Sequence, residues 1–193
     1  MRSTQTLPDN YTPIFEVDLQ KNKKMALWVN IAGAILMIAM AVPAAFIVPI
    51  SALFDMSEGL LVYSLRFIAL MAAYVVYIIL HELTHGIAMK LCGTKKVKYG
   101  FTGLYAFAGS DDYYGKGAYI FIALAPVVLW GAILAIICPL LPHSWFWVAY
   151  FVQIGNIGGA AGDFYVTLKF SRMPSDILVK DRGVSMTVFS ATK

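Results

Sequence analysis

Residues 67–86 read FIALMAAYVVYIILHELTHG, and this stretch decides what kind of fold the sequence encodes. Residues 67–80 are all apolar or aromatic, whereas residues 81–85 bring in two histidines and a glutamate. A transmembrane helix needs about 20 predominantly apolar residues in succession. The apolar segment extends from about Leu65 to Cys92, with Arg66 and Lys90 near its ends, so it is long enough to cross a bilayer with the two histidines and the glutamate inside it. Such groups are costly in hydrocarbon unless they have a partner or a polar cavity.

The composition of the whole chain also indicates a membrane protein. Of the 193 residues, 60% are hydrophobic and 13% are charged, whereas a soluble domain has about a quarter charged residues. The net charge of +4 is modest, and the charges lie between apolar runs, so we expect a lipid bilayer and no nucleic acid as partner. Cys92 and Cys138 fall at opposite ends of the predicted spans, so we expect no disulfide between them. The sequence has no CxxC pattern, and any metal site must use His and carboxylate ligands.

We predict an all-α integral membrane protein with four transmembrane helices. Besides the segment just quoted, apolar runs cover residues 25–54, 117–141 and 145–170. The first run is longer than a bilayer requires, and Pro43 and Pro49 are its expected bend points. The third span contains Pro126. The predicted domains are an N-terminal arm (1–24), a four-span membrane domain (25–170) and a C-terminal tail (171–193).

The distribution of basic residues predicts the orientation in the membrane. Fourteen of the 15 lysines and arginines lie in or beside the arm, the segment between the second and third spans, and the tail. The links at the other face hold only Arg66. Cytoplasmic segments carry the excess of Lys and Arg, so we expect a multi-pass protein of the cell membrane with both termini in the cytoplasm.

Two polar segments have β character. Residues 97–108 (VKYGFTGLYAFA) are rich in aromatic and β-branched residues, and residues 177–189 (ILVKDRGVSMTVF) hold two apolar runs around Asp181-Arg182-Gly183. Such a pattern favours short strands joined by a turn. An irregular interfacial loop remains the alternative for both segments.

The sequence HELTH (81–85) has the spacing of a metal site. His81 and His85 are four residues apart, which places both imidazoles on one face of a helix, as two ligands of a tetrahedral ion require. Glu82 lies beside them and is suited to take a proton from a water molecule at the metal. This arrangement is the zinc metallopeptidase pattern. The alternative is a proton-relay or substrate-binding trio without metal.

A zinc site with an open position needs a third protein ligand, and Asp163 is the best candidate. His143 lies in the link at the opposite face from His85, whereas Asp163, counted at about 1.5 Å per residue, lies at a depth similar to that of His85. Gly155 and Gly159 share its helical face and would allow close helix packing. An Asp paired with another polar group of the spans, and a glycine face that only packs or dimerises, stay open.

Asn156 lies seven residues before Asp163, on nearly the same helical face. Its amide could hydrogen-bond a substrate carbonyl or a developing oxyanion, as a catalytic residue does. It could equally bond a neighbouring helix.

The combination of HELTHG in one span with Asn156 and Gly162-Asp163 in a later span resembles the site-2 protease class of intramembrane zinc metalloproteases. From the second span through the tail, the chain is also similar to small bacterial four-span membrane proteins described as "putative zincin peptidases". The resemblance implies one zinc ion with His81, His85 and Asp163 as ligands and Glu82 as catalytic base. The sequence departs from the site-2 pattern, because Phe164 follows the aspartate and the usual prolines between Asn and Asp are absent.

We therefore expect a zinc metalloendopeptidase that hydrolyses peptide bonds of membrane-associated proteins or peptides near the cytoplasmic face. The segment 97–108 would offer an edge with which an extended substrate could pair. Two alternatives remain: a non-hydrolytic metal-binding membrane protein that senses, stores or transports zinc, and a scaffold whose polar trio only joins helices. A homodimer is compatible with the glycine faces.

Overall fold

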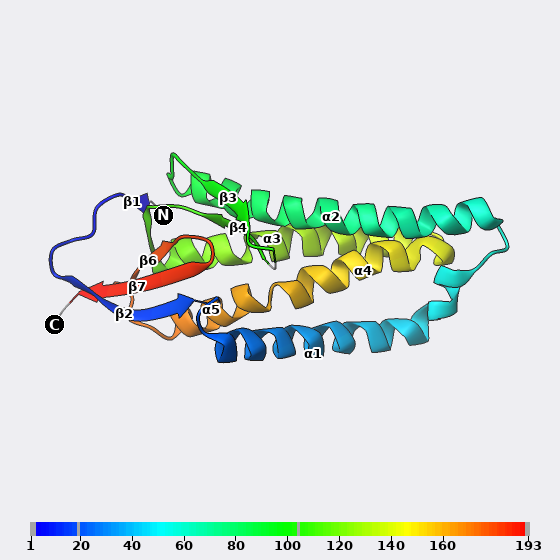
Figure 1. The fold of residues 1–193 in the computed structure, drawn as a ribbon, viewed down its shortest axis with the longest axis horizontal. Helices are drawn as coiled ribbons and strands as arrows, with labels where there is room; N and C mark the ends of the chain where they lie inside the picture. Colours follow the sequence, from blue (N-terminus) through cyan, green and yellow to red (C-terminus); the bar gives the residue numbers. More distant parts are fainter. Residues whose placement is uncertain (1–2, 19, 104, 192–193) are drawn as a thin grey trace. The chain divides into compact units, whose positions relative to one another are not determined.

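The computed structural model describes residues 3–18, 20–103 and 105–191, so Arg2, Leu104 and Lys193 of the predicted segments lie outside the described residues. The described residues form five α-helices, two short 3₁₀ helices and seven strands (Figure 1). The helices are α1 (Lys23–Ile47), η1 (Ile50–Phe54), α2 (Leu60–Leu91), α3 (Lys116–Ile137), η2 (Cys138–Leu140), α4 (His143–Gly159) and α5 (Ala161–Ser171). The strands are β1 (Ser3–Thr4), β2 (Tyr11–Asp18), β3 (Lys98–Phe101), β4 (Ala106–Gly109), β5 (Tyr113–Gly115), β6 (Leu178–Asp181) and β7 (Ser185–Ala191).

The chain forms two compact units, each built from segments that are distant in sequence. The sheet unit combines Met1–Val29, His81–Pro126 and Gly162–Lys193. The helix unit combines Asn30–Leu80 and Val127–Ala161.

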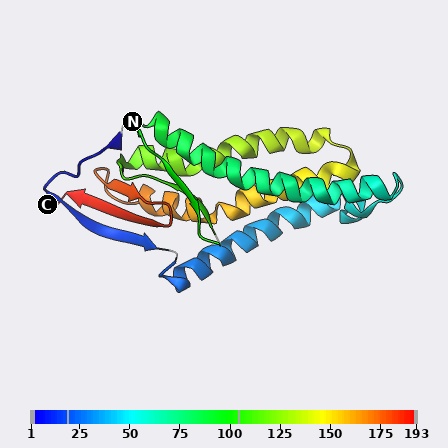
Figure 2. The same ribbon diagram turned by 45° about the horizontal axis from the view of Figure 1, so that its top comes forward.

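A five-stranded antiparallel sheet organises the sheet unit. Its strand order is β1-β5-β6-β7-β2, and Figures 1 and 2 show β2 (blue) beside β7 (red). Alternate side chains of a strand point to opposite faces, and the apolar ones on one face enter a common core with residues of α2, α3 and α5. The fully buried members of this core include Tyr114, Val179 and Val188 from the strands and Met89, Ile122 and Phe170 from the helices.

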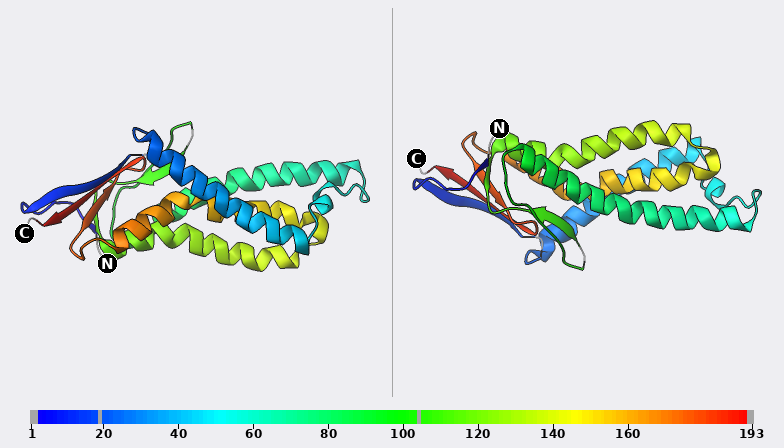
Figure 3. Two further views of the ribbon diagram at one scale, coloured as in Figure 1. Left: turned by 90° about the horizontal axis from the view of Figure 1, so that it is seen from below. Right: turned by 90° about the horizontal axis from the view of Figure 1, so that it is seen from above.

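A second, two-stranded sheet pairs β3 with β4 (Figure 3). Two glycines let this hairpin approach its neighbours closely. A side chain at Gly86 of α2 would collide with the Tyr99 hydroxyl, and a side chain at Gly183, which follows β6, would collide with the ring of Phe107. Gly183 also has a φ of +94°, a backbone conformation that favours glycine. The hairpin therefore rests on α2 on one side and on the β6–β7 turn on the other.

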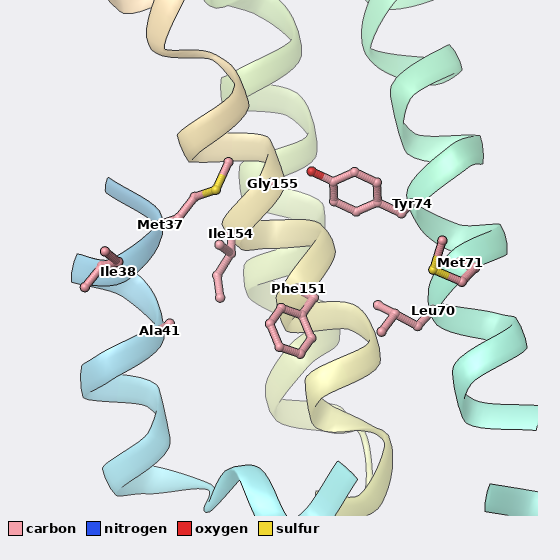
Figure 4. Close-up of a pocket in the computed structure, with 9 residues that line it drawn as sticks. All are labelled: Met37, Ile38, Ala41, Leu70, Met71, Tyr74, Phe151, Ile154 and Gly155. Carbon is pink, nitrogen blue, oxygen red and sulfur yellow. The ribbon is translucent and has the colours of Figure 1, made fainter. Parts of the chain in front are cut away.

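Close helix contacts hold the helix unit together. A Cβ atom at Gly33 of α1 would lie 2.6 Å from the carbonyl oxygen of Gly158 in α4, so the two backbones touch as small residues allow. A groove of about 440 Å³ lies among α1, α2 and α4 (Figure 4). Its lining is apolar except for the hydroxyl of Tyr74, and consists of Met37, Ile38, Ala41, Leu70, Met71, Tyr74, Phe151, Ile154 and Gly155.

The predicted all-α fold class is wrong, because the protein is a mixed α/β structure. The two polar segments with β character do contain strands, but β2, β5 and β1 lie in segments for which no strand was predicted. The pairing of β2 with β7 joins residues from the two ends of the sequence, and local periodicity carries no information about such a partner.

The prediction of four transmembrane helices is also corrected. Within the described residues, three helices are long and apolar enough to cross a membrane: Lys23–Ile47, Leu60–Leu91 and Lys116–Leu140. The predicted fourth span is two helices, α4 and α5, separated at Ala160. The break follows Gly158 and Gly159, and glycine is among the poorest helix formers.

Candidate metal centre

The two histidines of the HELTH sequence lie one turn apart on α2, as their spacing predicts. Their ring centroids are 4.8 Å apart and the rings are inclined at 81°. The side chains are largely buried, with 13% of His81 and 12% of His85 exposed. Both ring nitrogens needed for a metal therefore lie at a sheltered but accessible place in the sheet unit.

Asp163 of α5 faces both histidines. The Nε2 atom of His81 lies 3.5 Å from its Oδ2 atom, and the Nε2 atom of His85 lies 3.6 Å from its Oδ1 atom. The three residues offer ligand atoms that all lie within 4.8 Å of one another. Ligands at about 2.0–2.1 Å from a tetrahedral zinc ion would be roughly 3.4 Å apart. The separations to Asp163 are longer than a good hydrogen bond and close to the edge of that tetrahedron.

His85 is held from behind by a backbone carbonyl. Its Nδ1 atom is 2.9 Å from the carbonyl oxygen of Ile122 in α3, and because a carbonyl can only accept, the Nδ1–H group donates. The Nε2 atom then carries the lone pair and faces Asp163. Metal-binding histidines use the same outer hydrogen bond to fix their tautomer and ring orientation.

Glu82 is the fourth ionisable residue of the centre. Its carboxylate lies against the backbone N–H of Ala108 in β4. This contact joins the predicted catalytic base to the two-stranded sheet.

Asp181 at the end of β6 is a buried carboxylate close enough to interact electrostatically with His85 and Asp163. It accepts hydrogen bonds of 2.7 Å from the Tyr119 hydroxyl and from the backbone N–H of Gly183. Burial raises the pKa of Asp181 to about 6, although these two hydrogen bonds oppose the rise. The sequence indicated a turn here and gave no sign of a buried acid.

The structure places the other two candidates in the helix unit. Asn156 is fully buried. Its Oδ1 atom accepts from the Tyr77 hydroxyl at 2.9 Å, and its Nδ2 atom donates to the Val127 carbonyl at 3.2 Å. These bonds are those of the helix-packing alternative, and the catalytic role of Asn156 stays a prediction. His143 is the exposed first residue of α4 and is not part of the His/Asp group.

The donor set fits a zinc ion. Two imidazole nitrogens and one carboxylate oxygen are the ligands of an open, catalytic type of zinc site, in which a fourth position is left for water or substrate. Neither thiolates, which soft metals prefer, nor the six or more oxygens of a calcium site are part of the group.

Besides Asp181, two contributors to the centre are not predicted from the sequence, because both act through the main chain. They are the Ile122 carbonyl and the Ala108 N–H group. A main-chain atom is the same in every residue type, so the sequence does not mark it. Pro126 is a signal for the Ile122 carbonyl, because a proline four residues later leaves that carbonyl without its helical donor.

Comparisons with known proteins relate the segment that holds these residues to a described family. Residues 74–178, which include His81, Glu82, His85 and Asp163, match a protein family described as "Putative zincin peptidase". The chain is 32% identical over 117 residues to an uncharacterized 24.7 kDa protein of Pyrococcus woesei, an alignment that covers 58% of this chain. The chain spans about half (50%) of the length of that relative. No solved structure matches the fold.

Proposed function

This chain belongs to the family described as "Putative zincin peptidase", and from that premise we propose that it is a zinc-dependent endopeptidase acting on membrane-associated proteins or peptides, in the manner of the site-2 proteases. The observation that carries the proposal is the convergence of His81, His85 and Asp163 on one point, with Glu82 beside them.

Each residue of the centre has a distinct role in this proposal. His81, His85 and Asp163 would hold the ion. The chemistry that zinc supplies is Lewis acidity toward a peptide carbonyl and toward water. Glu82 would take the proton of the attacking water and pass it to the leaving amine. Asp163 and Glu82 thus divide the two tasks of a carboxylate, since one binds metal and the other moves a proton.

The strand pairing supports a location of this centre at one face of a membrane. β1 and β2 come from the N-terminal arm, β5 from the segment between α2 and α3, and β6 and β7 from the tail. Paired strands must lie on the same side of a bilayer, and these are the segments rich in Lys and Arg. The strand pairing and the basic residues both favour the cytoplasmic face of the cell membrane for the sheet unit. In this arrangement Lys23–Ile47, Leu60–Leu91 and Lys116–Leu140 are spans, and α4 and α5 lead the chain back to that face.

Among the described residues no strand pairs with the edge of β4 that faces away from β3, and this edge, called the free edge below, suits an extended substrate. The Thr102 N–H group donates to the Tyr105 carbonyl at the end of the hairpin. Because hydrogen-bonded pairs alternate along an antiparallel ladder, Gly100 and Phe107 form the next such pair. The N–H groups of Ala106 and Ala108 therefore point to the free edge, and the latter meets Glu82. A peptide that pairs with this edge would lie beside the catalytic base.

We expect the variant Ala106→Pro to slow peptide hydrolysis while zinc stays bound. Proline removes one N–H group from the free edge without breaking the ladder to β3. Ala106→Ser keeps the N–H group and is the matched control. Equal hydrolysis rates for both variants would remove the edge from the proposed mechanism.

The decisive experiment combines metal content with hydrolysis. Elemental mass spectrometry of the purified protein, prepared without chelators and resupplied with zinc, should find about one zinc per chain, and His85→Ala and Asp163→Ala should lose most of it. Glu82→Gln should keep the zinc and lose hydrolysis of a library of fluorescence-quenched peptides in detergent micelles. Absence of stoichiometric metal would overturn the proposal. Bound metal in a protein whose Glu82→Gln variant is indistinguishable from it would favour the non-hydrolytic metal-binding protein.

A further inference from the structure

The hydrogen bond behind His85 depends on an unusual property of its acceptor. In an α-helix the carbonyl of each residue accepts the N–H group of the residue four positions later. For Ile122 of α3 that residue is Pro126, which has no N–H group. The Ile122 carbonyl is thus one of the few in the middle of a helix that has lost its regular donor.

The missing donor of the Ile122 carbonyl matters because this part of α3 is buried. Ile122 is 1% exposed, and Pro126 is among the side chains that are fully buried. A buried carbonyl without a donor costs free energy, so nearly all such groups have a partner. Here the Nδ1–H group of His85, at 2.9 Å, supplies the hydrogen bond.

We propose that Pro126 is a positioning residue for the metal centre, because it frees the Ile122 carbonyl to hold His85 in the tautomer whose Nε2 atom faces Asp163. This inference rests on the proposed function for its consequence, since the consequence is tighter metal binding. The positioning itself is a property of the metal-free protein. Pro126 never touches the ion or a substrate. It acts because it has no N–H group to donate to the Ile122 carbonyl.

The variant Pro126→Ala restores the missing donor. The new N–H group at position 126 competes with His85 for the Ile122 carbonyl, so His85 should lose its fixed tautomer. Outer-shell partners of metal-binding histidines typically change metal affinity by 10–100-fold, and we expect Pro126→Ala to weaken zinc binding at least about tenfold. Pro43→Ala is the matched control, because Pro43 also lies inside a helix, α1, but belongs to the helix unit. It should leave zinc affinity unchanged.

Two measurements test the inference separately from the proposed function. Competition with a chromogenic chelator gives the zinc affinity of each variant. Nitrogen-15 NMR of histidine-labelled, metal-free protein at a pH where imidazole is neutral gives the tautomer. The chain has three histidines, and loss of a signal in His85→Gln assigns the relevant one. We expect His85 to carry its proton on Nδ1 in the unmodified protein and in Pro43→Ala, and to become a mixture in Pro126→Ala.

The outcomes distinguish the two ideas. If the unmodified protein binds zinc but Pro126→Ala changes neither affinity nor tautomer, the positioning role is overturned and the proposed function stands. If no variant binds zinc but the tautomer shifts in Pro126→Ala alone, the positioning role stands and the proposed function fails. A Pro126→Ala variant that unfolds would lose its NMR dispersion. In that case Pro126→Ser, tested in the same way, must still shift the tautomer for the inference to survive.

Discussion

At the scale of single residues, the centre is assembled from groups that different local causes hold in place. The helical repeat of α2 aligns His81 with His85. The break after Gly159 starts a new helix, and Asp163 falls in its first turn, where the helix dipole favours a negative charge. The Ile122 carbonyl orients His85, and β4 contacts Glu82. Apart from that break, which belongs to the last residues of the helix unit, these supports are features of the sheet unit.

Asp181 gives a pH-dependent contribution to stability whose sign follows from its environment. The pKa of Asp181 is about 6 in the folded protein, whereas an unfolded Asp has a pKa of about 3.9. Between these values the folded state holds the proton and the unfolded state has lost it, so stability falls as pH rises through this window. From pH 5 to pH 7 the metal-free protein should lose on the order of 1 kcal/mol through this one group.

The variant Asp181→Asn isolates that contribution. Its free energy of unfolding, measured in detergent without metal, should not include this fall between pH 5 and pH 7. Parallel pH dependences in the variant and the unmodified protein would contradict the assignment.

The sequence was informative about the side chains of the centre and silent about its main chain. His81 and His85 follow from a spacing, and the candidacy of Asp163 follows from counting depth along an apolar run. Both are properties of a residue type at a position. Asp181 could not be singled out, because its burial depends on the sheet and on Tyr119, which is 62 residues away.

At the scale of elements, Arg66 fixes the connection between η1 and α2. Its side chain is 0% exposed. It donates to the carbonyl oxygens of Leu53 and Asp55 at 3.2 and 2.7 Å, and it forms an ion pair of 3.0 Å with Glu58. Arg66 is the one basic residue in the links predicted to lie opposite the cytoplasmic face. Its contacts show that it stabilises the end of η1.

We expect Arg66→Ala to lower the free energy of unfolding by about 3 kcal/mol, because a fully buried side chain is removed and the buried Leu53 carbonyl and the part-buried Asp55 carbonyl lose their donor. Glu58→Ala should cost less than about 1 kcal/mol, since Glu58 is 49% exposed and exposed ion pairs contribute little. Thermal unfolding in one detergent compares the two. Similar losses for both variants would show that the ion pair, and not the carbonyl contacts, stabilises this connection.

Elements with a strong local signal were predicted well, and those that depend on partners were not. Apolar length predicted a helix at each of α1, α2 and α3, although α1 ends at Ile47 and α2 begins at Leu60, five to seven residues from the predicted bounds. Pro49 separates α1 from η1 as a bend point should. Strand β2 contains Pro13 and exposed polar residues, so its own pattern is weak. It is a strand because β7 pairs with it.

At the scale of the whole molecule, the register of β2 on β7 allows a direct test of topology. Glu16 is the partner of Thr187, and partners in an antiparallel pair have Cα atoms about 4.5–5.5 Å apart, within the range of a disulfide. The double variant Glu16→Cys/Thr187→Cys should cross-link within one chain under mild oxidation in intact membranes. Glu16→Cys/Met186→Cys is the control, because Met186 faces the other side of the sheet. Failure of the first pair to cross-link would contradict a shared location for the arm and the tail.

The pairing of β2 with β7 also imposes an order of events on biosynthesis. The ribosome releases β2 before any of the helices and β7 after all of them, so β2 waits without its partner while the membrane region is made. An unpaired strand can pair with the wrong strand. Pro13, which lacks an N–H group, and the charge of Glu16 both disfavour such pairing before β7 is made. Because β7 follows all the helices in the chain, the five-stranded sheet is complete only after every helix has been synthesised.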